Sequence, residues 1–349
     1  MAHDPNSTSR RWADEPVADI SATSESARQA DGAVVVEPYD PERSDSLERT
    51  TTATSPVEDA ADEMRGTQKW KLYLRRFMRN RMAVVGLVIF LLLVAMALFG
   101  KYLTPWAFDD PDFLNLATGP SSEHWFGTTD SGNDLFAQTV HGLGRSLIIA
   151  VGVSLATSVL SAIIGAGAAL YGGWVEKVIL ATIHFLLAIP TFLLIALFVS
   201  DTGGDWRMLM LVLIIFGWMY PARVIWSLAL SIRENDYVRA ARFMGVSRPR
   251  TIVRHIVPNI ASLLIIQFMM GVVSTVMSET ALSFLGLGVK LPDVSLGTLL
   301  SGGAGALSSA PWQFYFPALV LTLLTVSMAF IADGLRDALD PNSNSGGRV

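Results

Sequence analysis

The chain has 349 residues with a mean hydropathy of +0.42, and 51% of its residues are hydrophobic. Only 16% are charged, against roughly 25% for an average soluble domain, which favours a membrane protein. The sequence has no cysteine, which excludes disulfides and thiolate metal sites.

Residues 1–68 differ in charge from the rest of the chain. They hold 15 of the 31 acidic and 6 of the 26 basic residues, so this part is acidic and the remainder is slightly basic. Their polar composition predicts a disordered tail, and they lack the apolar stretch of roughly 7–15 residues that a signal peptide needs. The tail is either solvated without a specific role or docks on a partner, for which only Val34–Val36 offers an apolar anchor.

A basic segment, residues 69–81, precedes the first of six stretches with no more than one charge each. A helix that crosses a membrane needs about 20 largely apolar residues, and charged residues mark where each stretch ends. We predict an all-α polytopic membrane protein with a transmembrane domain over residues 82–341 and a short polar tail, residues 342–349. The predicted spans are about 82–102, 147–170, 177–200, 208–231, 256–284 and 312–335.

Basic residues next to the spans predict the orientation, because Lys and Arg favour the cytoplasmic side. Residues 69–81 and 233–255 are rich in them, whereas residues 101–145 hold only two. Both termini and the second and fourth loops are therefore expected in the cytoplasm, with the first, third and fifth loops outside.

Three residues within the spans are candidates for the transport pathway or for a structural role. Pro190 lies in the middle of the third span, where proline kinks a helix. Arg223 and Glu279 are ionisable groups inside spans, which are functional hypotheses by default. Arg223 can reach the cytoplasmic surface by snorkelling, and Glu279 lies near the outer face. Neither is at the bilayer centre, which lowers the case for an ion-coupled secondary carrier.

An enzymatic role is not indicated. The sequence has no GxxxxGK[ST], HExxH or GxSxG motif, and its five histidines form no ligand-spaced pair within a helix. We expect no catalytic residue, metal or cofactor on this chain, and no nucleic-acid partner.

The fourth loop, residues 233–255, contains six arginines and an apolar helical pattern. The pattern has the spacing of one helix face, carried by Tyr237, Ala240, Ala241 and Met244. Gly245 suits the left-handed position that ends a helix, and Ser247 with Pro249 suits the start of the next. The alternative is a basic loop that only sets topology and contacts anionic lipids. Such a loop needs no ordered apolar face.

Four motifs resemble segments of one known protein family. RAAxxxG with HxVP, residues 239–258, resembles the EAA loop of bacterial ABC importer permeases. HWFGTTDSGND (124–134), ETALSFLGLG (279–288) and DGLRDALDP (333–341) resemble segments of the dipeptide, oligopeptide and nickel permeases in that group. The resemblance covers about residues 70–341.

The resemblance implies a type I ABC importer permease fold in a bacterial inner membrane. It implies a homologous second permease, one or two cytoplasmic ABC ATPases that use ATP and Mg²⁺, and an extracytoplasmic binding protein that delivers peptides. Nickel chelates or glutathione are alternative substrates; a secondary carrier or channel, or a membrane scaffold with a regulatory tail, is an alternative class. The fourth loop would be the coupling helix docked on the ATPase, through Asp236, Tyr237, Arg239, Ala240, Ala241, Arg242, Met244, Gly245, Val246 and Ser247.

The sequence departs from the family pattern at six positions, two of which are His255 and Val257 in place of Ile and Leu. Arg239 stands where the general pattern has Glu, and this reverses the charge offered to the ATPase. Thr129 and Asn133 replace Asp and Arg in the outer segment. Trp226 stands where relatives often have a second Arg after the one matched by Arg223.

Overall fold

A computed structural model describes residues 71–201 and 203–339; the predicted tails, residues 1–68 and 342–349, lie outside these ranges. The described residues are helical apart from loops and two isolated β-bridges, Pro111–Asn133 and Thr128–Asp134. The helices are α3 (Arg81–Phe99), η2 (Gly100–Tyr102), α4 (Leu135–Tyr171), α5 (Gly173–Ala188), α6 (Thr191–Ser200), α7 (Trp206–Gly217), α8 (Met219–Arg233), α9 (Asp236–Phe243), α10 (Arg248–Thr251), η3 (Ile252–Ile256), α11 (Val257–Phe284), α12 (Leu296–Gly305) and α13 (Trp312–Leu339).

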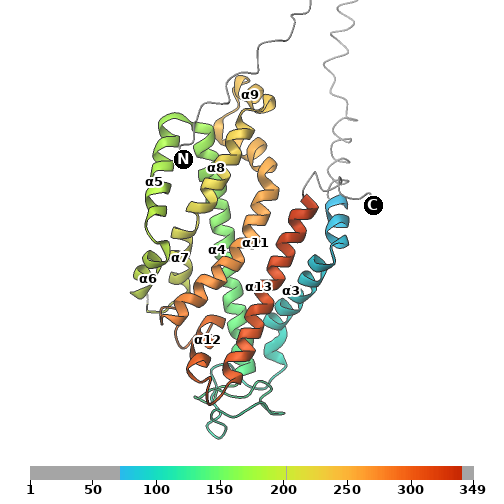
Figure 1. The fold of residues 1–349 in the computed structure, drawn as a ribbon, viewed down its shortest axis with the longest axis vertical. Coiled ribbons are helices and arrows are strands. Elements are labelled where there is room, and N and C mark those ends of the chain that lie inside the picture. The colour runs from blue at the N-terminus through green and yellow to red at the C-terminus, as the bar shows by residue number, and fades with distance from the viewer. Residues whose placement is uncertain (1–70, 202, 340–349) are drawn as a thin grey trace, which may run out of the picture. The chain divides into compact units, whose positions relative to one another are not determined.

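Five of the helical stretches in the described part are long and apolar enough to cross a membrane, and the bent pair α5–α6 makes a sixth candidate. The long helices run alongside one another, with α9 near one end and α12 near the opposite end (Figure 1). We call these the α9 end and the α12 end. The first residues of α3 and the last of α13 lie toward the α9 end. There, the side-chain amide of Asn80 donates to the Asp337 carboxylate at 3.1 Å.

Helix α4 starts at Leu135, well before the predicted span of 147–170. The Asp134 carboxylate caps it by accepting from the Ala137 amide at 2.7 Å, which satisfies one of the free N–H groups of the first turn. With 37 residues, α4 is about 55 Å long at 1.5 Å per residue. It therefore extends beyond a hydrocarbon core of about 30 Å.

The predicted third span, 177–200, is not one continuous helix. It is broken at Ile189–Pro190, where α5 and α6 meet at an angle of 78°. Proline has no N–H and clashes with the preceding turn, so the helix cannot continue through it.

A wider turn precedes helix α11. Residues Ile252–Ile256 form a π-helical segment in which the Val257 amide donates to the carbonyl of Ile252, five residues earlier. Pro258 lies two residues after this segment, and proline clashes with the regular helical turn before it. We attribute the wider turn to this proline, since such bulges relieve local conflicts inside helices.

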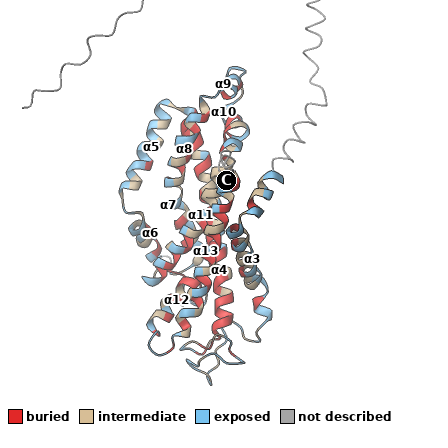
Figure 2. Cartoon of the chain, turned by 45° about the vertical axis from the view of Figure 1, so that its right-hand side comes forward, coloured by how far each residue is buried: buried red, intermediate tan, exposed pale blue. Residues whose placement is uncertain are grey.

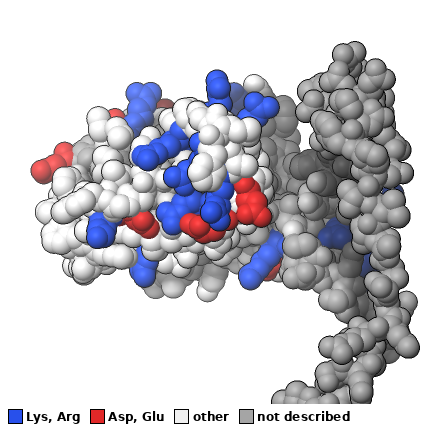
Figure 3. Space-filling model, turned by 90° about the horizontal axis from the view of Figure 1, so that it is seen from above, with Lys and Arg blue, Asp and Glu red and all other residues white. Residues whose placement is uncertain are grey.

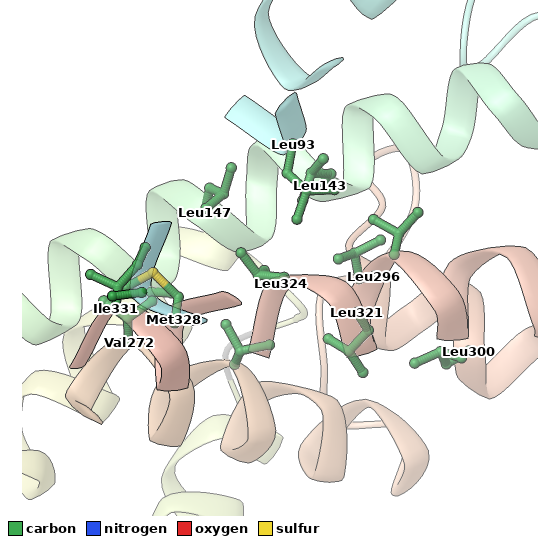
Figure 4. Close-up of a cluster of buried hydrophobic side chains, with 14 of the residues drawn as sticks. Leu93, Leu143, Leu147, Val272, Leu296, Leu300, Leu321, Leu324, Met328 and Ile331 are labelled. Atoms are coloured by element: carbon green, nitrogen blue, oxygen red, sulfur yellow. The ribbon is translucent and has the colours of Figure 1, made fainter. Parts of the chain in front are cut away.

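The core forms where α4 faces its neighbours, and Figure 2 shows α4 buried along much of its length. One apolar cluster joins α3, α4, α11, α12 and α13, and its members include Leu143, Val272, Leu324 and Met328 (Figure 4). A second joins α4 and α8 to α9, η3 and α11, and it includes Val238.

Small residues allow α4 and α8 to pack closely. A Cβ added at Gly165 would lie 2.5 Å from the Ala222 carbonyl oxygen and 3.0 Å from Ile225 Cβ. In lipid, such close packing drives helix association, because burial of apolar surface between helices gains little.

Replacing Gly165 with Ala should lower the stability of the bundle by about 1–3 kcal/mol, the usual cost of overpacking. Gly167→Ala is the matched control: a Cβ there meets nothing within 4 Å, and alanine favours helix by roughly 0.5–1 kcal/mol. Thermal unfolding of the purified chain in detergent measures both. Equal transition temperatures for the two variants would contradict the packing described here.

Candidate functional site

The predicted helix in the fourth loop is present as α9, and its end at Gly245 is confirmed. Gly245 has φ of 81°, the left-handed conformation. Its amide donates to the Arg242 carbonyl and the Val246 amide to the Ala241 carbonyl, both at 3.1 Å. This pair of bonds is a Schellman motif, which terminates a helix and satisfies its last carbonyls.

The start of α10 is only partly as predicted. Ser247 is the N-cap residue and Pro249 lies in the first turn. However, the Ser247 side chain makes no capping bond; its carbonyl instead accepts from the Thr251 amide at 2.9 Å. The first turn is therefore closed by this regular helical bond, and Thr251 Oγ1 donates to the same carbonyl at 3.2 Å.

The predicted apolar stripe of α9 is divided between two faces. Ala241 is buried, whereas Tyr237, Ala240 and Met244 are exposed. The second inward-facing residue is Val238, three positions before Ala241, which packs in the cluster of α4, α8 and α11. Sequence reasoning missed Val238 because apolar residues occur on both sides of this short helix. Val238 fixes α9 to the bundle and leaves the other face free.

The free face of the loop is both basic and apolar. Arg239 and Arg242 are exposed and, with Phe243, line a surface groove of about 270 Å³. Phe243 is 86% exposed and was not among the predicted residues. Lys and Arg side chains gather at the α9 end of the bundle, where acidic side chains are fewer (Figure 3). The remaining predicted docking residues flank this surface. Asp236 and Ser247 are exposed, and Val246 is partly exposed.

The predicted candidates within the spans have different surroundings. Pro190 lies at the break between α5 and α6 and is exposed. Arg223 is exposed on α8, and no ion pair joins it to another described residue. Glu279 is 1% exposed and accepts hydrogen bonds from the hydroxyls of Ser283 and Ser295 at 2.8 and 2.6 Å. Because Ser295 also caps α12, Glu279 joins α11 to α12.

At the α12 end, the segment of residues 124–134 is anchored by a buried histidine. His124 is 2% exposed, and its Nδ1 lies 2.8 Å from the Asp134 carboxylate, the cap of α4. The pKa of Asp112 is lowered most by a hydrogen bond from the Asn115 side chain and next by one from the Leu114 amide. His124 lies 3.4 Å from the same carboxylate.

The two outer positions that depart from the family pattern pair with each other. The Asn133 amide donates to Thr129 Oγ1 at 3.1 Å, and the Thr129 amide donates to the Asn133 carbonyl at 2.9 Å. The neighbouring Asp130 accepts from Gln313 of α13 at 3.0 Å. Local hydrogen bonds thus close the turn with these residue types.

A second cluster at the α12 end joins α4 to the loop after α11. Asp293 lies 2.8 Å from His141 Nε2 and 2.7 Å from Arg145 Nη2. Arg145 also covers the Trp206 ring, 4.3 Å from its centroid. Burial would raise the pKa of Asp293, but hydrogen bonds from His141 and Arg145 lower it below the ordinary value. Asp293 and Lys290 line a cavity of about 630 Å³ that also borders Asp130.

The described residues form a bundle of candidate membrane-spanning helices, with the exposed helix α9 held between two of them. A family model described as "Binding-protein-dependent transport system inner membrane component" matches residues 158–344, more than half of the chain. A second, "N-terminal TM domain of oligopeptide transport permease C", matches residues 68–120.

Similar proteins include oligopeptide permeases from several bacteria. The chain is 44% identical over 276 residues to the oligopeptide transport system permease protein OppC of Mycobacterium tuberculosis, which covers 78% of this chain and 95% of that protein. It is 34% identical over 281 residues to OppC of Escherichia coli, covering 80% and 93%. It is 32% identical over 284 residues to the dipeptide transport system permease protein DppC of Alkalihalophilus pseudofirmus, covering 81% and 93%.

The chain belongs to the family of binding-protein-dependent transport system inner membrane components. It is the non-catalytic, multi-pass membrane component of an ABC transport system, a type of system that works with an ATPase and a binding protein. The family and fold expected from the sequence are confirmed.

Asp293 gives a prediction for the dependence of stability on pH. Because the folded state lowers its pKa, its contribution is present above the ordinary value of 3.8 and is lost as the pH falls through the folded pKa. Asp293→Asn should cost about 1 kcal/mol at pH 7, as expected for a partly exposed ion pair. The difference from the unmodified chain should shrink as the pH is lowered below 3.8.

Thermal unfolding across this pH range measures the effect, with the exposed Asp201→Asn as control. A loss of stability that is the same at every pH would contradict the assignment.

Proposed function

We propose that the chain is one of two homologous permease subunits of a type I ABC importer that carries oligopeptides or dipeptides across a bacterial inner membrane. The observation that carries the proposal is α9: an exposed helix, fixed by Val238 and ended by Gly245, between the long helices α8 and α11. The permeases that resemble this chain are named for oligopeptide and dipeptide transport.

In this proposal, α9 is the coupling helix and its exposed face enters a groove on one of one or two cytoplasmic ATPase subunits, which bind and hydrolyse ATP with Mg²⁺. A helix held at both ends suits this role, because movement of the ATPase tilts α8 and α11 together. Arg239 and Arg242 require acidic groups in the groove, and Tyr237, Phe243 and Met244 require an apolar part.

The proposed orientation places the α9 end, with both termini, in the cytoplasm. Basic residues at that end support it. The α12 end would then face outward and receive peptides from the extracytoplasmic binding protein.

We place the transport pathway between this chain and the second permease. The break at Pro190 supports a place for α5 and α6 along it, since irregular backbone at membrane depth is tolerated only within protein or beside water. Arg223, exposed on α8, is a second candidate.

Reconstitution of both permeases, the ATPase and the binding protein in vesicles tests the function. ATP-dependent accumulation of a labelled peptide is expected. Binding of the same peptide to the binding protein alone identifies the substrate, and uptake without ATP would instead support a secondary carrier.

Two changes in the loop test the role of α9. Arg239→Glu should lower uptake about tenfold or more, because reversing a charge inside a complementary groove costs several kcal/mol. Gly245→Pro should do the same, because proline cannot adopt positive φ. Both complexes should still insert and assemble. Arg336→Glu, the same charge change on the exposed face of α13, is the control. Normal uptake by both loop variants would refute the docking proposal.

A further inference from the structure

The turn between α4 and α5 is contacted by the helix that precedes α9 in the chain and by the helix that follows it. This turn, residues 169–176, comprises the end of α4, Gly172 and the start of α5, and it belongs to neither α9 nor its flanking helices. It is contacted by α8, which precedes α9, and by α10, which follows it.

The contacts from α8 are two hydrogen bonds. Trp226 Nε1 donates to Glu176 Oε1 at 2.8 Å. Arg233 Nη1 donates to the carbonyl of Ala169 at 2.7 Å. Ala169 lies in the last turn of α4, where carbonyls lack partners within the helix and a positive charge is favourable. Both bonds are charge-assisted, the stronger class of hydrogen bond.

The contact from α10 is a cation over an aromatic ring. The guanidinium carbon of Arg248 lies 4.8 Å from the centroid of the Tyr171 ring, within the range of a favourable cation–π interaction. Between these contacts, a Cβ added at Gly172 would lie 3.6 Å from Arg233 Nη1 and 3.9 Å from Glu176 Oε2. Side chains from both neighbours of α9 therefore contact the turn, although Tyr171 and Trp174 remain exposed.

We propose that these side chains, Tyr171, Glu176, Trp226, Arg233 and Arg248, form a turn clamp that makes α4 move together with α9. The inference rests on the proposed function of α9 as the coupling helix. It assigns the clamp residues a positioning role: they touch neither ATP nor substrate, and they act by transmitting movement to α4.

Helix α4 is suited to carry such movement across the membrane. It is the 37-residue helix that runs from the clamp to the α12 end. Helix α8 approaches it so closely at Gly165 that an added Cβ would lie 2.5 Å from the Ala222 carbonyl oxygen. At the other end, His141 and Arg145 of α4 bind Asp293 beside the cavity of about 630 Å³. Displacement of the clamp would therefore reach the loops that border this cavity.

Trp226 gives the clamp a feature that sets this chain apart from the family pattern, in which an arginine often stands at this position. An indole has one N–H, so Trp226 offers Glu176 a single, directional hydrogen bond. Replacing the indole with a phenyl ring removes that donor and keeps most of the apolar ring.

The test measures peptide transported per ATP hydrolysed in the reconstituted complex. Trp226→Phe and Glu176→Leu should each lower this ratio roughly fivefold, the size of effect that a lost hydrogen bond has on an equilibrium. The double variant should be no worse than either single one, because both remove the same bond. Glu176→Gln keeps an oxygen acceptor and should retain most of the ratio.

Trp174→Phe is the matched control, since Trp174 lies in the same turn, is 81% exposed and its indole has no partner among the described residues. An unchanged ratio in Trp226→Phe, or an equal fall in Trp174→Phe, would overturn the clamp. Either result would leave the proposed function standing if the unmodified complex still takes up peptide with ATP. A complex that never takes up peptide would instead count against the proposed function.

A second measurement does not depend on transport. The chain has no cysteine, so Lys177→Cys and Arg250→Cys place two spin labels, one beside the turn and one on α10. With cysteine-free partners, the clamp predicts the same label distance in the resting and the nucleotide-bound complex. Trp226→Phe should broaden the distribution. A distance that changes with nucleotide in the unmodified clamp would refute the proposal.

Discussion

The close approach of α4 and α8 is the contact on which the rest of the structure depends. In lipid, burial of apolar surface contributes little to helix association. Small residues such as Gly165 and Ala166 must therefore allow the two backbones to approach closely. Helix α9 continues the chain from α8 and inserts Val238 into the cluster beside this contact. The exposed face of α9 therefore has a fixed position because α8 has one.

Much of the helical content follows from the sequence, because charged residues bound the apolar stretches. The α9 helix and its end at Gly245 were predictable for the same local reason: the backbone requirement at that position is met by glycine. The start of α4 was not predictable, because Arg145 resembles a boundary. Its partner, and that of His141, is Asp293, which lies 152 residues after the histidine, and no local pattern announces such a contact.

Three further features of the candidate site required coordinates. Pro190 indicates where a helix breaks, but the angle of 78° depends on what each half packs against. Ser247 is a suitable cap by type, yet its side chain makes no capping bond and only its carbonyl takes part, accepting from the Thr251 amide. Tyr237 and Met244 look like core residues by spacing, although in this chain they are exposed. Their exposure depends on which face of α9 packs on the bundle, and the periodicity of one short helix does not determine that face.

The hydrogen bond between Asn80 and Asp337 joins the beginning of the first long helix to the end of the last. The described bundle thus closes on itself, and the chain enters and leaves it at one place (Figure 1). Two bundles of this kind, joined in tandem in a single polypeptide, would keep the same orientation with a linker that never crosses the membrane. The proposed pairing with a second permease is therefore compatible with separate subunits and with one fused chain.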